Sequence, residues 1–224
     1  MIKIIIFVLL LILLFVVINI FYNYYKEGFT STSPPSLDWI QNGEGIEGIP
    51  GQMSNVALSH YGSLLAISYP GANNNKGIVS LYENIDNNWT KIGNDLEGEE
   101  NGDKFGYSIA ISSSSRRGDR VVIGAPLHSG RKGRVYVYDR NGSSWSQVGG
   151  NLDGVGAGDH FGHSVSIKIG GHRIAVGAPY NNNGGRSNSG HVRVFRYDSS
   201  NNTWTKVGQD IVGEAAQDQT GYSV

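Results

Sequence analysis

Apolar residues are distributed in two different ways along this chain of 224 residues. Residues 4–22 form an apolar run that only Asn19 interrupts, and the run contains no Gly or Pro. Beyond residue 53, apolar residues fall into short segments that Gly, Asn and Ser separate. The first distribution predicts a membrane-spanning helix, and the second predicts short β-strands joined by turns.

The N-terminal run is long enough to cross a bilayer. As a helix its 19 residues would span about 28 Å, close to the ~30 Å hydrocarbon core. A cleaved signal peptide usually has a shorter apolar stretch and a small-residue cleavage site, and a core helix has a polar face. This run has neither feature. We therefore expect residues 1–27 to be an uncleaved signal anchor and residues 28–36 to be a polar linker.

Charges at the two ends of the run predict its orientation. Lys3 and the terminal amine flank one end, whereas Lys26 at the other end is offset by Glu27. Positive charges favour the cytoplasmic side of a membrane. We therefore expect a single-pass protein with its N-terminus in the cytoplasm and residues 37–224 in an extracellular or lumenal space.

Four sequence features recur in the same order along the rest of the chain. The first contains Asp-x-Phe-Gly or a variant, the second ends in Gly-Ala-Pro, the third alternates apolar and polar residues, and the fourth contains Trp. They are DKFGYS (103–108), DHFGHS (159–164) and DQTGYS (218–223); RVVIGAP (120–126) and RIAVGAP (173–179); GIVSLYE (77–83), GRVYVYD (133–139) and GHVRVFRYD (190–198); and the segments around Trp89, Trp145 and Trp204. The Trp residues lie 56 and 59 residues apart, and such a period indicates a repeat protein.

Each unit has the pattern of four short antiparallel strands. Within residues 133–139, Val135 and Val137 should face one side of a sheet while Tyr136 and Tyr138 face the other. One such sheet cannot bury its faces alone, so neighbouring sheets must stack. Stacking by radial repetition gives a β-propeller. A flat β-sandwich is the alternative, but its strands would not repeat at one period with the same landmarks.

The order Phe-Gly, Gly-Ala-Pro and Trp-x-x-x-Gly resembles FG-GAP repeats over about residues 53–224. These repeats build the propeller heads of integrin α-subunits and occur in many secreted or membrane-anchored proteins. The resemblance implies an all-β propeller with a role in binding or adhesion. Kelch repeats are the nearest alternative, but they would have Gly-Gly after the second strand, where this sequence has Gly-Ala-Pro.

The number of units predicts an incomplete propeller. We expect units at residues 37–102, 103–158 and 159–217, and the start of another at residues 218–224, with its first strand at residues 221–224. Propellers have roughly 4–8 blades, so about three blades plus one strand cannot close a ring. We infer either a truncated reading frame or copies of the chain that associate through open blade edges, which otherwise tend to aggregate.

Composition and charge exclude several kinds of site. Cys is absent, which excludes disulfides, thiolate metal sites and a Cys nucleophile. The 18 Lys and Arg residues against 19 Asp and Glu residues give a net charge of −1. This balance argues against a nucleic-acid partner, which needs a basic excess. The 32 Gly residues suit a turn-dense β protein.

The candidate metal ligands are Asp103, Asp159 and Asp218, which recur before the Phe-Gly position. A cation such as Ca²⁺ needs several converging oxygen ligands. The resemblance to FG-GAP repeats implies that a Ca²⁺-binding copy would carry an Asp-x-Asp-x-Asp-Gly loop between its first two strands. In this sequence the corresponding loops are residues 59–63, 112–119 and 167–172, and none of them carries paired carboxylates. We therefore expect no cofactor, with calcium as the alternative. We expect these three Asp residues to be turn residues whose carboxylates accept backbone N–H groups.

Two kinds of short motif lie in predicted turns. Three Asn-x-Ser/Thr sequons begin at Asn88, Asn141 and Asn201. They are glycosylation candidates if the domain faces a eukaryotic lumen, although Asn-rich turns produce the same triplets by composition. Arg117, Gly118 and Asp119 form an RGD tripeptide, which resembles an integrin ligand, although turn composition alone accounts for it.

These features predict a membrane-anchored binding or adhesion module that is not an enzyme. Polar loops at residues 73–75 and 181–185 should present a protein or glycan ligand site on one face. This function rests on analogy of fold. One alternative is the propeller body of a glycan-active hydrolase, which would need acid and base carboxylates converging at the propeller axis. The other is a truncated structural remnant without independent function.

Overall fold

The computed structural model describes residues 41, 43–113 and 119–224 of the chain, which divides into two units, residues 1–41 and 42–224. The second unit contains every strand described below. The predicted anchor and linker, residues 1–36, lie outside the described residues. No helix in the described part of the chain has both the length and the apolar character needed to span a membrane.

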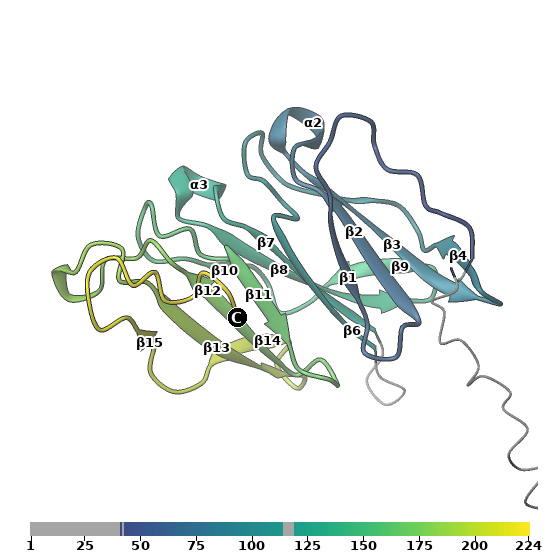
Figure 1. Ribbon diagram of the computed structural model, residues 1–224. Coiled ribbons are helices and arrows are strands. Elements are labelled where there is room, and N and C mark those ends of the chain that lie inside the picture. Colours follow the sequence, from purple (N-terminus) through teal and green to yellow (C-terminus); the bar gives the residue numbers. More distant parts are fainter. Residues whose placement is uncertain (1–40, 42, 114–118) are drawn as a thin grey trace, which may run out of the picture. The chain divides into compact units, whose positions relative to one another are not determined.

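Three antiparallel sheets follow one another along the chain (Figure 1), which confirms the all-β prediction. The first contains β1 (Asn55–Leu58), β2 (Leu64–Tyr69), β3 (Ile78–Ile85), β4 (Asn88–Lys91) and β5 (Leu96–Glu97). The second contains β6 (Ser108–Ser112), β7 (Arg120–Ala125), β8 (Arg134–Asn141), β9 (Ser144–Gln147) and β10 (Leu152–Asp153). The third contains β11 (Ser164–Ile167), β12 (Arg173–Ala178), β13 (His191–Asp198), β14 (Thr203–Lys206) and β15 (Ile211–Val212). Short helical turns follow the second strand of each sheet: α2 (Ala72–Asn75), α3 (His128–Arg131) and η1 (Asn183–Gly185).

Each sheet has one strand more than predicted because its outer strand is divided in two. In the first sheet, β4 pairs with residues 82–85 of β3 and β5 pairs with residues 78–79, so both lie along the same edge. Gly93, at φ +69°, lies between them and interrupts the extended backbone. Gly149 and Gly208 hold the same position in the second and third sheets, at φ +75° and +73°.

Residues 221–224, which were expected to begin another sheet, form no strand. Only Thr220 pairs there, through an isolated bridge to Gly190. A strand exists by pairing its backbone groups with a neighbour. Within the described residues, no second strand lies beside residues 221–224 to provide that pairing.

The three Trp residues hold the same place in successive sheets. Each pairs with the seventh residue of the third strand: Trp89 with Asn84, Trp145 with Arg140, and Trp204 with Tyr197. The repeat in the sequence is therefore also a repeat in three dimensions. Its period is set by the length of one complete sheet with its connections.

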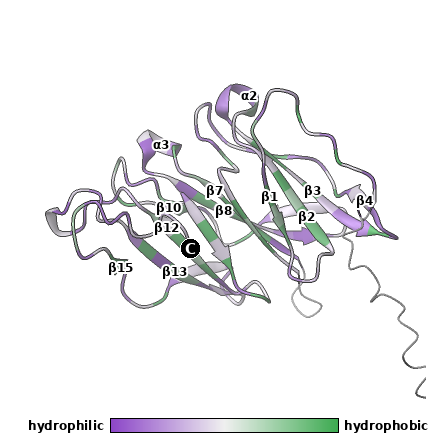
Figure 2. Cartoon of the chain, viewed as in Figure 1, coloured by the Kyte–Doolittle hydropathy of each residue, from purple (hydrophilic) through white to green (hydrophobic). Residues whose placement is uncertain are grey.

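The hydrophobic core lies between the sheets. One cluster of buried side chains joins the first sheet to the second, and another joins the second to the third. Within β8, Val135 and Val137 belong to the second cluster while Tyr136 and Tyr138 pack in the first, as the alternation predicts. Figure 2 shows hydrophobic residues along the strands, whereas the α2 and α3 turns are hydrophilic.

The Phe-Gly and Gly-Ala-Pro motifs meet at the junctions between sheets. Phe105 and Phe161 are fully buried, at 0% exposure. The next residue, Gly162, donates its N–H to the Gly177 carbonyl at 3.0 Å, and its own carbonyl accepts the Ser108 hydroxyl at 2.7 Å. The Ser108–Gly162 bond joins the second sheet to the third, at the end where the first strand of each sheet begins, whereas the Gly162–Gly177 bond lies within the third sheet.

The glycine of Gly-Ala-Pro is required because two backbones approach closely. A Cβ atom on Gly124 would overlap the carbonyl oxygen of Gly162, and a Cβ atom on Gly177 would overlap that of Gly221. Neither Gly124 nor Gly177 has a positive φ, so the requirement is for space. In the first sheet Ser68 stands at this position, and its hydroxyl donates to the Gly106 carbonyl at 2.7 Å.

The outward faces of the first and third sheets are only partly covered. Leu58 is 57% exposed, whereas its counterpart Ile111 in the second sheet is 7% exposed. Val207 in the third sheet is 39% exposed, whereas its counterpart Ile92 in the first sheet is 5% exposed. Each end of the three-sheet array therefore exposes residues that are buried at an internal junction.

His191, the first residue of β13, is a buried polar residue whose ring nitrogens make no hydrogen bond to the described residues. The residue is 1% exposed. Burial, followed by the nearby Arg193 charge, lowers the pKa of His191, while Asp210 and Asp159 oppose this shift and Lys206 adds to it. Such unpaired atoms cost roughly 1–3 kcal/mol each.

Replacing Gly124 by Ala tests the steric account of the junction. We expect G124A to lower the free energy of unfolding by about 3 kcal/mol, because the added methyl group forces two backbones apart. Denaturant unfolding of the full chain in detergent measures this. The matched control is G45A, since a Cβ atom on Gly45 meets nothing within 4 Å. Equal stability of G124A and G45A would contradict the account.

His191 predicts a loss of stability in mild acid. Its folded pKa lies below the ordinary value of 6.5, so the unfolded chain binds a proton near pH 6.5 that the folded chain excludes. Stability is therefore complete above pH ~6.5 and falls as the pH drops below it. In H191I, which carries the residue that Ile78 supplies in the first sheet, the fall between pH 7 and pH 5 should be shallower. Unfolding curves at several pH values measure this, and identical slopes would contradict it.

Candidate functional site

Three loops follow the second strands of the three sheets. They comprise residues 72–76, 128–132 and 181–189 and are called the loop face below. Figure 1 shows that α2 and α3, in the first two loops, lie on the same side of the sheets. These loops include both segments, 73–75 and 181–185, that were expected to present a ligand site.

Each loop is fixed by the segment that enters the next sheet. Two consecutive backbone N–H groups of that segment donate to two consecutive loop carbonyls. The pairs are Lys104 to Asn75 (2.9 Å) and Phe105 to Lys76 (3.1 Å); His160 to Arg131 (2.9 Å) and Phe161 to Lys132 (3.2 Å); Gln219 to Asn188 (3.0 Å) and Thr220 to Ser189 (3.0 Å). The buried Phe of each junction thus lies directly beside the bonds that hold a loop.

The first two loops contain left-handed backbone. Asn73, Asn74 and Asn75 have φ between 52° and 62°, and Ser129 and Arg131 have φ of 50° and 65°. Asn tolerates this region better than most residues, whereas Ser and Arg adopt it at a cost. The surrounding hydrogen bonds hold these residues in that conformation, so the loops are rigidly shaped.

The recurring Asp residues close the turns that lead into each sheet. The carboxylates of Asp103, Asp159 and Asp218 accept the backbone N–H of the residue three positions earlier, at 3.1, 2.8 and 2.7 Å. Asp103 also accepts the His128 Nδ1–H at 2.9 Å, and Asp159 accepts the Asn181 Nδ2–H at 2.7 Å. These bonds tie each turn to the loop of the following sheet.

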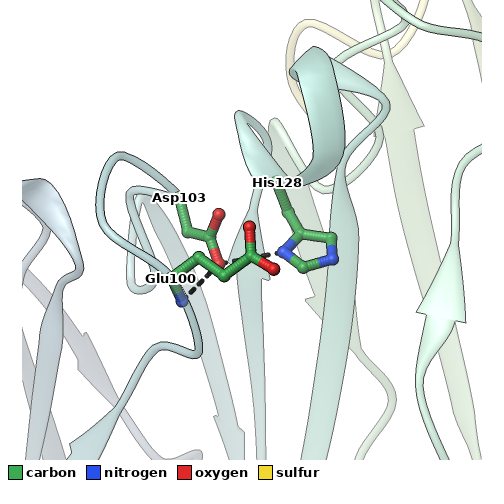
Figure 3. Close-up of side chains that lie close together, drawn as sticks. All are labelled: Glu100, Asp103 and His128. Carbon is green, nitrogen blue, oxygen red and sulfur yellow. Dashed lines mark hydrogen bonds and ion pairs between the residues drawn. The ribbon is translucent and has the colours of Figure 1, made fainter.

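At the first junction a second carboxylate joins this arrangement (Figure 3). The ligand atoms of Glu100, Asp103 and His128 all lie within 4.8 Å of one another, and Asp103 and His128 are buried. A divalent cation could replace the proton on His128 there. At the next junction Gly156 and Asn181 stand in place of Glu100 and His128, while Asp159 keeps the same hydrogen bonds. Both junctions therefore share the hydrogen bond in which the Asp carboxylate accepts the backbone N–H three residues earlier and closes the turn.

The other candidate residues lie away from the loop face. The exposed sequon residues lie where the third and fourth strands are joined: Asn88 begins β4, Asn141 ends β8, and Asn201 lies on the turn before β14. Arg117 and Gly118 of the RGD tripeptide lie outside the described residues. The Asp119 carboxylate is engaged by the Ser113 hydroxyl at 2.8 Å and by Arg140 at 3.2 Å.

Five rings form a cluster beside the loop face that sequence analysis missed. This aromatic cluster consists of Tyr107, His160, His163, Tyr180 and Tyr222. His163 lies at its centre, with ring centroids 5.1 Å from Tyr107, 4.6 Å from Tyr222 and 6.1 Å from Tyr180. His160 packs on Tyr180 at 4.7 Å. The Tyr107 hydroxyl and His163 Nε2 are 3.3 Å apart.

The cluster is uncharged at neutral pH. Burial lowers the pKa of His160 and of His163, so both imidazoles are neutral. Burial, followed by the neighbouring Tyr222, raises the pKa of Tyr107. A signal for the cluster was present in the sequence, because the residue after Phe-Gly or Thr-Gly is an aromatic ring in all three copies: Tyr107, His163 and Tyr222.

Comparison with known proteins identifies the repeat. A family model for the FG-GAP repeat matches residues 97–138 and 153–195. A search of curated protein sequences gives no match. Two segments of the chain therefore match the FG-GAP repeat, and they lie in the three consecutive antiparallel sheets.

Similar solved structures agree on the fold. A proposed 6-phosphogluconolactonase from Bacteroides fragilis has 14% sequence identity and a TM-score of 0.52, with 77% of this chain and 42% of that chain covered. A second from Bacteroides uniformis has 14% identity and a TM-score of 0.50, with 77% and 44% covered. This chain therefore spans less than half the length of either protein, and the likeness at this identity shows the fold alone.

Removing the Asp carboxylates tests their role in turn closure. We expect D159A to lower the free energy of unfolding by about 1–3 kcal/mol, because the Gly156 N–H and the Asn181 amide lose their acceptor. D218A should cost less, since the exposed Asp218 has one such bond, to the Ala215 N–H. Thermal unfolding of both variants measures the difference, and the reverse order would contradict the assignment.

Proposed function

We propose that this protein is a membrane-anchored FG-GAP propeller module that binds a protein or glycan ligand through its loop face. The observation that carries the proposal is the repeated pair of backbone bonds that fixes every loop to the segment entering the next sheet. A loop that is already ordered loses little conformational entropy when it binds. Loops on a rigid scaffold are also where propellers and other β folds place their binding residues.

The membrane anchor in this proposal is the apolar run of residues 4–22. Its flanking charges favour an N-terminus in the cytoplasm and a propeller in an extracellular or lumenal space. The sequons are compatible with that location, since all three Asn residues are exposed where the third and fourth strands are joined. Each third strand is eight residues long, so its sequon end lies about 23 Å from the end that begins at the loop face. Glycans there would leave the loop face accessible.

Catalysis is not part of the proposal. The names of the two Bacteroides proteins concern lactone hydrolysis, but a fold shared at 14% identity does not transfer an activity. The polar groups converging near the loop face, Asp103 and Asp159 with their partners, are engaged in turn closure.

Charge reversal on the loop face tests the binding function. The full chain in lipid nanodiscs is screened against a printed glycan panel and a panel of purified extracellular protein domains. We expect capture of at least one probe, with about tenfold weaker capture by R131E and R186E because these exposed side chains lie on the loop face. R196E, an exposed position on β13 away from the loops, is the matched control. Capture of no probe, or equal capture by all variants, would contradict the proposal.

Thiol labelling tests the topology. The chain contains no Cys, so single introduced thiols report unambiguously. If the propeller is extracellular, we expect S199C, on an exposed turn, to react with a membrane-impermeant maleimide on intact cells. If the propeller is lumenal, S199C should react in sealed microsomes only after their membrane has been permeabilised. K3C should show the opposite accessibility. Identical labelling of the two variants on both sides would refute a single-pass anchor.

A further inference from the structure

We propose that the aromatic cluster is a stacking subsite for a neutral sugar ring, which makes a glycan the ligand of the loop face. This inference rests on the proposed binding function and names its ligand class. It is carried by the placement of three rings at one position of successive repeats, by the exposure of Tyr107 and Tyr222, and by the packing of both rings on His163.

Two rings of the cluster, those of Tyr107 and Tyr222, are exposed to solvent. Tyr107 is 41% exposed and Tyr222 is 56% exposed, whereas Phe105, two residues before Tyr107, is completely buried. The Phe therefore supplies the packing at the junction, and the Tyr rings belong to neither core cluster. Exposed aromatic rings grouped on one surface are typical of interaction sites.

Hydrogen bonds hold the backbone that carries each of the three rings. The backbone N–H groups of Tyr107, His163 and Tyr222 each donate to the carbonyl three residues earlier, at 2.9, 3.0 and 3.0 Å. Tyr180 supports His163 edge-on, at an interplanar angle of 81°. A ligand therefore meets a preformed surface and does not have to order it.

The shape and chemistry of this surface match a sugar ring. The Tyr107 and Tyr222 rings both pack on His163, tilted 53° and 46° from its plane. Ring faces offer apolar contact to C–H groups, while Tyr hydroxyls at the ring edges exchange hydrogen bonds with hydroxyl groups. A pyranose has the same division, with C–H groups on its faces and hydroxyls around its rim. Because the imidazoles are neutral at pH 7, an ionic ligand gains no counter-charge from the rings.

Sugar binding is tested with the full chain in lipid nanodiscs and a panel of methyl pyranosides of glucose, galactose, mannose, fucose and N-acetylglucosamine. Saturation-transfer NMR should show contact between the protein and the ring C–H protons of at least one of them. We expect Y107A and Y222A to raise the dissociation constant about tenfold, through loss of a stacking face. Y222F, which keeps the ring, should remain close to the unchanged protein.

The matched control is Y61A. Tyr61 is also an exposed Tyr, at 73% exposure, and it also contacts a His ring, that of His60 at 4.8 Å, but it lies on the β1–β2 turn outside the cluster. Y61A should leave sugar binding unchanged, and unfolding curves confirm that each variant is folded. Absence of saturation transfer from every pyranoside, or transfer that persists in the Y107A/Y222A double variant, would overturn the inference.

Two outcomes separate this inference from the proposed function. If a protein-domain probe is captured in a way that depends on Arg131 and Arg186 while no sugar binds, the sugar assignment falls and the binding function stands. If a Pro-rich peptide binds and is lost in Y107A and Y222A, the cluster is a peptide site and the sugar assignment is again wrong. If neither probe panel nor any sugar binds, both proposals fail.

Discussion

The structure depends on the close approach of two backbones where successive sheets meet. Between the second and third sheets the Gly162 carbonyl lies against Gly124, where no Cβ atom fits, and between the first and second sheets the Gly106 carbonyl accepts the Ser68 hydroxyl at the same position. A twisted four-stranded sheet exposes apolar residues on both faces, so stability comes from bringing sheets close enough to exclude water. The missing side chain at Gly124 permits this distance between the inner strands of the second and third sheets.

The same contact positions the surface that we propose to bind ligand. The buried Phe fixes the segment entering each sheet, and that segment holds the preceding loop through two backbone bonds. One residue beyond the glycine, the chain turns an aromatic ring toward its counterpart from the neighbouring repeat. Packing, loop rigidity and the aromatic cluster are therefore consequences of one short motif. This explains how a repeat can keep its core while the residues on its loops differ from copy to copy.

Much of the fold could be predicted because it is encoded within single repeats. The alternation in β8 and the spacing of the three Trp residues depend on neighbouring residues or on one period. Features that arise between repeats were missed. The contact of Tyr107 with His163, the approach of Glu100 to His128 and the division of the outer strand all depend on how sheets or strands meet in space. The strand expected at residues 221–224 did not form, because no neighbouring strand pairs with it among the described residues.

Native-state hydrogen exchange at two amides tests the central claim most directly. The N–H groups of Phe105 and Phe161 donate to the Lys76 and Lys132 carbonyls across the two junctions, at 3.1 and 3.2 Å. If the close glycine contacts hold the sheets together, both amides should exchange as slowly as those of the buried strand β7, through the same cooperative opening. Exchange as fast as at the exposed Gly150 amide would show that the sheets separate freely, and would contradict the account.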